Sequence, residues 1–247
     1  MSEAIPLYTI SRCIMDTDAD IARRQKLSSM FGMFQDIAAL HAENLGAAVD
    51  WLYRKLNLAW ILMRVRVEID QYPVLSQEVV IETWPQEPRA LYERDYLIRD
   101  MAGKVLVRAA STWVIMNLGT REIKRDRFLD YFGLELIKDR ALEKSIVRLR
   151  TMDRTKPVYA KEVKFSDVDY NVHVNNAKYV DFIMDCFSIE EHRERAIKAI
   201  EVHFINEIGP GETLKFRRKK VNERKDYVEG LRKTDGAYVF NALVEWN

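Results

Sequence analysis

The stretch GKVLVRAASTW, residues 103–113, decides the fold because a similar stretch recurs near the end of the sequence. A shift of 133 residues lays it over GAYVFNALVEW at 236–246, with Gly103 on Gly236 and Trp113 on Trp246. A shift of 135 lays VRVEIDQYPVLSQEV over VHFINEIGPGETL, and a shift of 149 lays DADIARRQK over DVDYNVHVN. The shifts differ through small insertions while the order of segments holds, which indicates an internal duplication.

Each half has the pattern of a helix followed by antiparallel strands. In the first half, apolar residues recur at helical spacing from Leu27 to Leu45, and Gly46 can end that helix. Alternating runs then predict strands at 60–70, 78–85, 92–100 and 104–117. The second half has a helical segment near 175–190 and strands in AIEVHFINEI, TLKFRRKKV, DYVEGLRK and AYVFNALVEW.

This order predicts an α+β chain of two copies, in which an antiparallel sheet of about four strands curls around each long helix. We place the N-terminal domain at residues 1–120 and the C-terminal domain at 158–247. The stretch between them, 121–157, is predicted to be a linker packed over the surface, with a short helix around FLDYFGLELIKD.

The composition restricts the class of protein. Of 247 residues, 48% are hydrophobic, and 39 basic against 38 acidic residues give a formal charge of +1. That balance argues against a dedicated nucleic-acid or membrane-surface protein. The longest uncharged apolar run, LNLAWILM, is too short to span a bilayer. Only two cysteines are present, which favours a reducing setting over a disulfide framework, so we expect a soluble cytoplasmic protein.

The chemically distinctive stretch is SDVDYNVHVNN, residues 166–176, in which polar side chains occupy every second position. Its alternating polar members are Asp167, Asp169, Asn171 and His173. In an extended strand all four would lie on one face. A calcium loop is excluded, because Val172 stands where that loop needs Gly and Lys178 where it needs a bidentate Glu.

A helix start lies directly after His173, signalled by Asn175 or Asn176. The backbone N–H groups at a helix start point outward without intrahelical partners. Together with the helix dipole they can stabilise the oxyanion that forms when an ester or thioester carbonyl is attacked. This placement favours a catalytic interpretation of the stretch.

The duplication supports the same interpretation. Where the second copy has Asn and His, the first copy has Ala22 and Arg24, so the fold does not require the polar set. An acidic residue, Glu207, lies among apolar residues of the second copy, and its counterpart in the first copy is Tyr72. One copy of a duplicated scaffold is therefore predicted to hold the active site.

Other reactive side chains indicate no metal, cofactor or nucleophile. Cys186 lies in an apolar helical run and is expected in the core. Ser111 and Ser166 lack the glycines of a nucleophile elbow. The other histidines have no nearby cysteine or spaced carboxylate cluster of the kind that binds zinc. They are His41, His192 and His203.

With DVDYNVHVNNAKYVDFIMD and, downstream, EVHFINEIGPGE, the chain resembles the acyl-acyl carrier protein (acyl-ACP) thioesterases of plant plastids and their bacterial relatives. The specific part is a D-x-N-x-H-x-N-N signature that opens a helix, followed by a strand that ends in an acidic residue. The resemblance implies a tandem hot-dog fold whose first copy shapes the acyl pocket and whose second copy is catalytic.

Carried over by position, the resemblance implies four site residues in this chain. They are Asp169, Asn171, His173 and Glu207. One departure is informative: many plant members have Cys just after the strand-end acid, and this chain has Ile208. A thiol mechanism at that place is therefore excluded.

The expected reaction is hydrolysis of a fatty acyl thioester by an activated water. Glu207 or Asp169 would accept the water proton, Asn171 and His173 would position water and substrate, and the helix start would hold the oxyanion. The choice between the two carboxylates stays open. Alternatives are an acyl-coenzyme A thioesterase, a hot-dog dehydratase and an acyl-binding module without activity.

The implied partner is an acidic acyl carrier protein. The strip KFRRKKVNERK, residues 215–225, could meet it, with ordinary solvated charge as the competing explanation. The residues that we favour for this contact are Lys219, Lys220, Arg224 and Lys225. Acyl chain length and oligomeric state stay open; a homodimer is one option, although two fused copies can already replace the dimer that single hot-dog domains form.

Overall fold

The computed structural model describes residues 3–88, 91–124, 134–144, 146, 148–151 and 155–247. The chain divides into two compact units. Unit 1 comprises Met1–Gln25 and Met33–Ile146, and unit 2 comprises Lys26–Gly32 and Val147–Asn247. Among the helices in the described ranges, none is long and apolar enough to cross a membrane.

Unit 1 contains an antiparallel sheet in the order β1-β3-β4-β5-β2, with the short β6 beside β5. Its strands are β1 (Tyr8–Cys13), β2 (Leu58–Ile69), β3 (Glu78–Pro85), β4 (Tyr92–Asp100), β5 (Val105–Asn117) and β6 (Ile123–Lys124). Its helical segments are the 3₁₀ turn η1 (Asp16–Asp18), most of α1 (Leu27–Asn44) and α2 (Val49–Leu56). The long helix is joined to the sheet by Phe34, whose ring lies 4.8 Å from that of Tyr96.

Unit 2 repeats this order with β7 in the place of β1, giving β7-β9-β10-β11-β8, again antiparallel. Its strands are β7 (Lys156–Glu162), β8 (Ile197–Phe204), β9 (Thr213–Asn222), β10 (Lys225–Arg232) and β11 (Tyr238–Trp246). Its helical segments are the 3₁₀ turn η2 (Phe165–Asp167), α3 (Asn176–Met184) and α4 (Ile189–Glu194).

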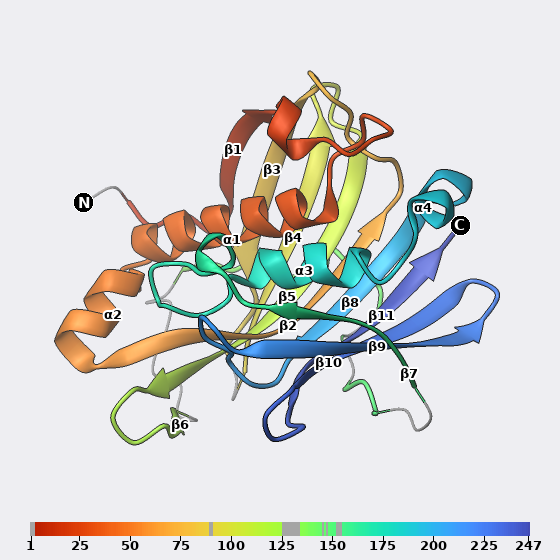
Figure 1. Cartoon of the computed structure of the whole chain (residues 1–247). Helices are drawn as coiled ribbons and strands as arrows, with labels where there is room; N and C mark the ends of the chain where they lie inside the picture. The colour runs from red at the N-terminus through yellow and green to blue at the C-terminus, as the bar shows by residue number, and fades with distance from the viewer. Residues whose placement is uncertain (1–2, 89–90, 125–133, 145, 147, 152–154) are drawn as a thin grey trace. The chain divides into compact units, whose positions relative to one another are not determined.

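Aromatic side chains join α3 to the sheet of unit 2, across whose strands the helix lies in Figure 1. The ring of Tyr179 on α3 lies 5.7 Å from that of Phe204 on β8 and 5.6 Å from that of Phe240 on β11. Burying one aromatic side chain of this kind contributes roughly 1.5–3 kcal/mol. Gly230 on β10 is required by the packing, because a Cβ at that position would lie 2.2 Å from the Phe240 ring.

The predicted α+β class and the predicted strands are confirmed with shifts of a few residues. One difference concerns 199–208, predicted as a strand to its end, because β8 stops at Phe204. The segment 175–190 is divided between α3 and α4. The hydrophobic periodicity did not predict the edge strands β1 and β7, because both are short and largely exposed.

The helix predicted around FLDYFGLELIKD falls partly on residues 128–133, which lie outside the described residues. The remainder, residues 134–139, has no helix. The end of the predicted linker, residues 156 and 157, belongs to β7. The assignment of residues 1–120 and 158–247 to separate domains stays a prediction.

Candidate active site

The stretch 165–175 is a compact loop and not the extended strand that its alternation predicts. It begins with the 3₁₀ turn η2 and ends where α3 begins at Asn176. Tyr170 is 81% exposed whereas Asp167 is 4% exposed, so the apolar and polar side chains are not sorted onto two faces. The strand prediction was wrong because Asp and Asn side chains bond to nearby backbone groups, which competes with a strand ladder.

Asp169 is the centre of this loop. Its Oδ1 accepts the backbone N–H of Asn171 at 2.9 Å, and its Oδ2 accepts from Nδ2 of Asn175 at 3.4 Å. Its own N–H donates to the carbonyl of His173 at 3.0 Å. The chain reverses through Val172, which takes the left-handed conformation with φ of 63°. The His173 side chain is thereby presented from a turn and not from a strand face.

The first copy builds the same loop from different residues. Asp20 Oδ1 accepts the N–H of Ala22 at 2.8 Å, and Asp20 N–H donates to the carbonyl of Arg24 at 2.8 Å. Arg23 takes the left-handed conformation with φ of 61°. Each of these residues precedes its counterpart by 149 positions. The duplication predicted from the sequence is confirmed by this shared pattern of hydrogen bonds.

The two copies differ in the side chains that the loop presents. His173 Nε2 lies 3.8 Å from Glu207 Oε2, and the two side chains are 43% and 39% exposed. At the equivalent places of the first copy, the Arg24 guanidinium lies 5.0 Å from the centre of the Tyr72 ring. An imidazole and a carboxylate are both groups that can act in general acid–base chemistry, whereas an arginine on a phenol ring offers no such pair.

The structure therefore brings two of the four predicted residues into contact. Asp169 uses both carboxylate oxygens inside the loop, so its contacts are those of a loop-forming residue. The side chain of Asn171 is exposed, and within the described residues no hydrogen bond joins it to His173 or Glu207. The catalytic roles of all four residues stay a prediction.

The predicted helix start is confirmed at Asn175, which caps α3 by accepting the N–H of Ala177 at 2.9 Å. The N–H of Lys178 bonds to the Asn175 carbonyl at 2.9 Å. Two of the first N–H groups of α3 are thus already engaged. An oxyanion at this helix start would depend on the N–H of Asn176 and on side-chain donors.

The residues that hold Glu207 were missed from the sequence. Nη2 of Arg232 donates to the backbone carbonyl of Glu207 at 2.9 Å. The buried hydroxyl of Tyr179 forms a hydrogen bond with the backbone of Ile208. Burial, and then the nearby charge of Glu207, raise the pKa of Tyr179 well above its usual value. The repeat contained a signal for Tyr179, because the first copy has Met30 at that place.

The other candidate groups have structural contacts. Cys186 is buried, burial raises its pKa to about 12, and its Sγ donates to the Phe182 carbonyl at 3.5 Å. His41 and His203 are also buried. His203 Nε2 lies 2.8 Å from Oε1 of Glu201. Within the described part of the chain, no three metal-binding side chains come together.

Two helix-on-sheet units, one of which presents the half-exposed pair His173 and Glu207 beside a helix start, define a double hot-dog protein with a candidate hydrolytic site in its second copy. The chain belongs to the acyl-ACP thioesterase family. Residues 8–127 match the acyl-ACP thioesterase N-terminal domain, and residues 151–247 match the acyl-ACP thioesterase C-terminal domain.

Known proteins resemble the chain along most of its length. A crystal structure of an acyl-ACP thioesterase from Bacteroides thetaiotaomicron has a TM-score of 0.90 and 26% identity and covers 100% of both chains. The 12:0-ACP thioesterase from Umbellularia californica, at 21% identity and a TM-score of 0.87, shares the fold over 100% of this chain and 99% of its own. The tandem hot-dog prediction is thereby confirmed.

Among curated relatives, the chloroplastic oleoyl-acyl carrier protein thioesterase 2 of Arabidopsis thaliana is 29% identical over 208 residues, which are 77% of this chain. The matched part is 56% of that relative. An acyl-[acyl-carrier-protein] hydrolase of Cuphea viscosissima is 25% identical over 94% of this chain and 60% of its own length. The chain thus spans a little over half the length of these two relatives.

Proposed function

We propose that this protein hydrolyses fatty acyl-ACP thioesters to a free fatty acid and the carrier thiol. The observation that carries the proposal is the contact of His173 with Glu207 in the second copy of a duplicated loop. Membership of the family and the names of its relatives support the thioester class of substrate. An acyl-coenzyme A thioester, with the same reacting bond, is the second candidate substrate.

In the proposed mechanism, Glu207 accepts a proton from a water molecule while the water oxygen bonds to the thioester carbonyl carbon. The carbon–sulfur bond then breaks, and the departing thiolate takes up a proton from the protonated site. We assign the base to Glu207 because both oxygens of the Asp169 carboxylate already accept hydrogen bonds in the loop. His173, 3.8 Å from that carboxylate, orients the water and the substrate.

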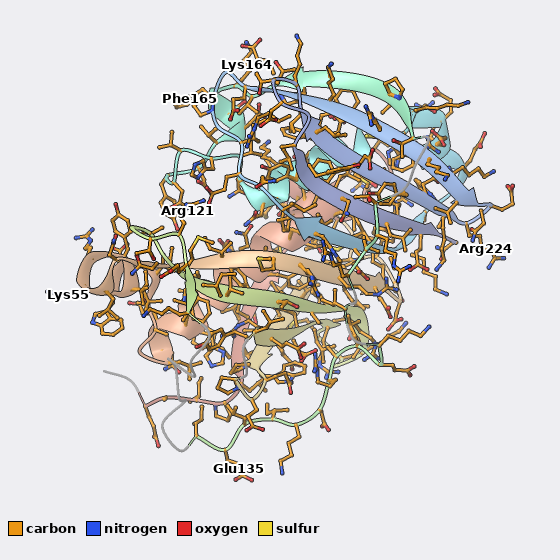
Figure 2. The ribbon with its side chains drawn as sticks, turned by 90° about the horizontal axis from the view of Figure 1, so that it is seen from below. Lys55, Arg121, Glu135, Lys164, Phe165 and Arg224 are labelled. Atoms are coloured by element: carbon orange, nitrogen blue, oxygen red, sulfur yellow. The ribbon has the colours of Figure 1, made fainter. Side chains whose placement is uncertain are left out.

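We propose that the acyl carrier is the acidic acyl carrier protein, and that the basic strip 215–225 contacts it. Several charges of the strip are paired: Lys220 with Glu223 at 2.7 Å and Lys225 with Glu245 at 2.9 Å. Figure 2 shows Arg224 at the end of unit 2 opposite Phe165, the residue that begins η2. We therefore expect these charges to act on the encounter rate and not on the chemical step.

Two proposals concern features outside the site. A cytoplasmic location agrees with two free cysteines, Cys13 and Cys186. For the oligomeric state, we propose either a homodimer or a monomer in which the two fused copies replace a dimer. Sedimentation of the purified protein and localisation of a tagged chain test these two points directly.

Thiol release from a chain-length series of acyl-ACP and acyl-coenzyme A thioesters tests the function. We expect hydrolysis by the wild type and loss of at least ~10²-fold in kcat for His173→Ala and Glu207→Gln. The matched controls are Arg24→Ala and Tyr72→Ala, which alter the equivalent pair of the first copy. Absence of thiol release for every acyl length would refute the proposal.

A further inference from the structure

The turn that carries Glu207 is held by an arginine of the neighbouring strand. Arg232 is the last residue of β10, and its Nη2 donates to the Glu207 carbonyl at 2.9 Å. Its Nε pairs with Oε1 of Glu212 at 3.2 Å. Because β8 ends at Phe204, strand pairing with β11 does not extend to Glu207. The arginine contact thus supplies a backbone restraint that the sheet does not.

Further contacts hold the residues that follow Glu207. Glu212 Oε2 accepts the N–H of Gly209 at 2.7 Å, which closes the turn. The carbonyl of Ile208 accepts a hydrogen bond from the N–H of Val174 at 3.1 Å. The Ile208 backbone also forms a hydrogen bond with the Tyr179 hydroxyl. Val174 directly follows His173, so the Ile208 bond joins the two segments that carry the His–Glu pair.

The first copy has the same turn without the charges. Gln77 Oε1 accepts the N–H of Val74 at 3.0 Å, as Glu212 does from Gly209, and both members of the pair are displaced by 135 residues. A neutral amide therefore suffices to close this turn. The carboxylate of Glu212 adds an ion pair with Arg232 that the fold does not need in the first copy.

The arginine itself also belongs to the second copy alone. Asp100 ends β4 as Arg232 ends β10 in the equivalent hairpin. The Asp100 carboxylate accepts hydrogen bonds within its own hairpin, from the N–H of Ala102 at 3.0 Å and from the N–H of Lys104 at 2.9 Å. At the place of Arg232, the first copy thus has an acidic residue that bonds within its own hairpin.

We propose that Arg232 is a positioning residue, which together with Glu212 holds the backbone of Glu207 so that its carboxylate stays beside His173. The inference rests on the proposed function, in which Glu207 is the base. A base must lie within reach of the proton that it removes, and a displacement of about 1 Å can cost ~10² in rate. Glu207 is half-exposed and lies beyond the end of its strand, where the Arg232 contact restrains its backbone.

Arg232→Met removes the restraint, and Arg99→Met is the matched control. Arg99 lies near the end of β4, pairs with Glu82 at 2.9 Å and donates to the Gly103 carbonyl at 3.0 Å. Its side chain is 30% exposed, against 24% for Arg232. Each variant therefore loses one bond to a backbone carbonyl. Arg99→Met also loses one ion pair, whereas Arg232→Met loses two, with Glu212 and, at 3.0 Å, with Asp235 of its own hairpin.

We expect kcat on the preferred acyl thioester to fall ~10–100-fold in Arg232→Met, with KM changed less than about threefold, because positioning acts on the chemical step. Arg99→Met should stay within about twofold of the wild type in both constants. Glu212→Gln should close the turn as Gln77 does yet lose the ion pair, so an intermediate fall in kcat is expected. An unchanged kcat in Arg232→Met would overturn the proposal.

Backbone amide exchange provides a readout that does not depend on activity. Exchange in a peptide covering 205–212 should accelerate about tenfold in Arg232→Met and not in Arg99→Met. Unchanged exchange refutes the positioning role even if activity is lost, since Arg232 would then act on the substrate. If the wild type releases no thiol, the proposed function fails, and the exchange result alone decides whether Arg232 holds the Glu207 turn.

Discussion

Replacing the two candidate bases one at a time separates a proton acceptor from a residue that shapes the loop. Glu207→Gln keeps the size of the side chain and removes its basicity. We expect kcat to fall ~10²–10⁴-fold, the usual contribution of a positioned base. Asp169→Asn should also lower kcat, by way of the loop, since its carboxylate accepts bonds from Asn171 and Asn175.

The two variants should differ most in stability. The His173–Glu207 contact is 3.8 Å long and its side chains are 43% and 39% exposed, so solvent screens it and its loss should cost under about 1 kcal/mol. In Asp169→Asn, the NH₂ group of the new amide would replace one of the two accepting oxygens. It would then face a donor, either the Asn171 N–H or the Asn175 Nδ2, and could not accept its hydrogen bond. Losing one of those charge-assisted bonds should cost about 1.5–3 kcal/mol.

Urea unfolding and thiol release measured on the same preparations test this pair of expectations. The expected pattern is an inactive, stable Glu207→Gln and a destabilised Asp169→Asn. The reasoning is refuted if Asp169→Asn keeps wild-type stability while losing activity more completely than Glu207→Gln. That result would make Asp169 the base and leave Glu207 as its supporting carboxylate.

Three further predictions concern the scaffold. Gly230→Ala should destabilise the protein by about 1–3 kcal/mol in urea unfolding, because the new Cβ would lie 2.2 Å from the Phe240 ring; an unchanged midpoint would contradict this. Burial, and then a nearby arginine charge, lower the pKa of His41 from 6.5 to about 4 in the folded protein. As the pH drops, His41 therefore takes up its proton in the unfolded chain before it does so in the folded protein. The free energy of unfolding should fall as the pH drops from about 6.5 to about 4. The loss should reach at most about 3 kcal/mol and be absent in a folded His41→Gln variant. In the native protein a thiol reagent at pH 8 should modify the exposed Cys13 and spare the buried Cys186, whose pKa is raised to about 12; denaturant should then expose the second thiol.

Much of the fold follows from local pattern. The strands at 78–85 and 92–100 agree with β3 and β4, because alternation over a half-buried surface is a strong signal. Edge strands gave a weak signal, since β7 is mostly exposed and buries few apolar side chains. The 166–176 stretch had the period of a strand, but local side-chain bonds make it a loop.

The sequence by itself determined the duplication, the α+β class and the candidate residues of the second copy, because element order and residue type are local properties of the chain. Only the tertiary structure decided which of those residues meet. It joins His173 to Glu207, leaves Asp169 inside its loop and brings Arg232 from another strand onto the Glu207 backbone. The contacts of Glu207 with His173 and Arg232 link residues far apart in the chain, so they depend on how the strands pair and where each one ends.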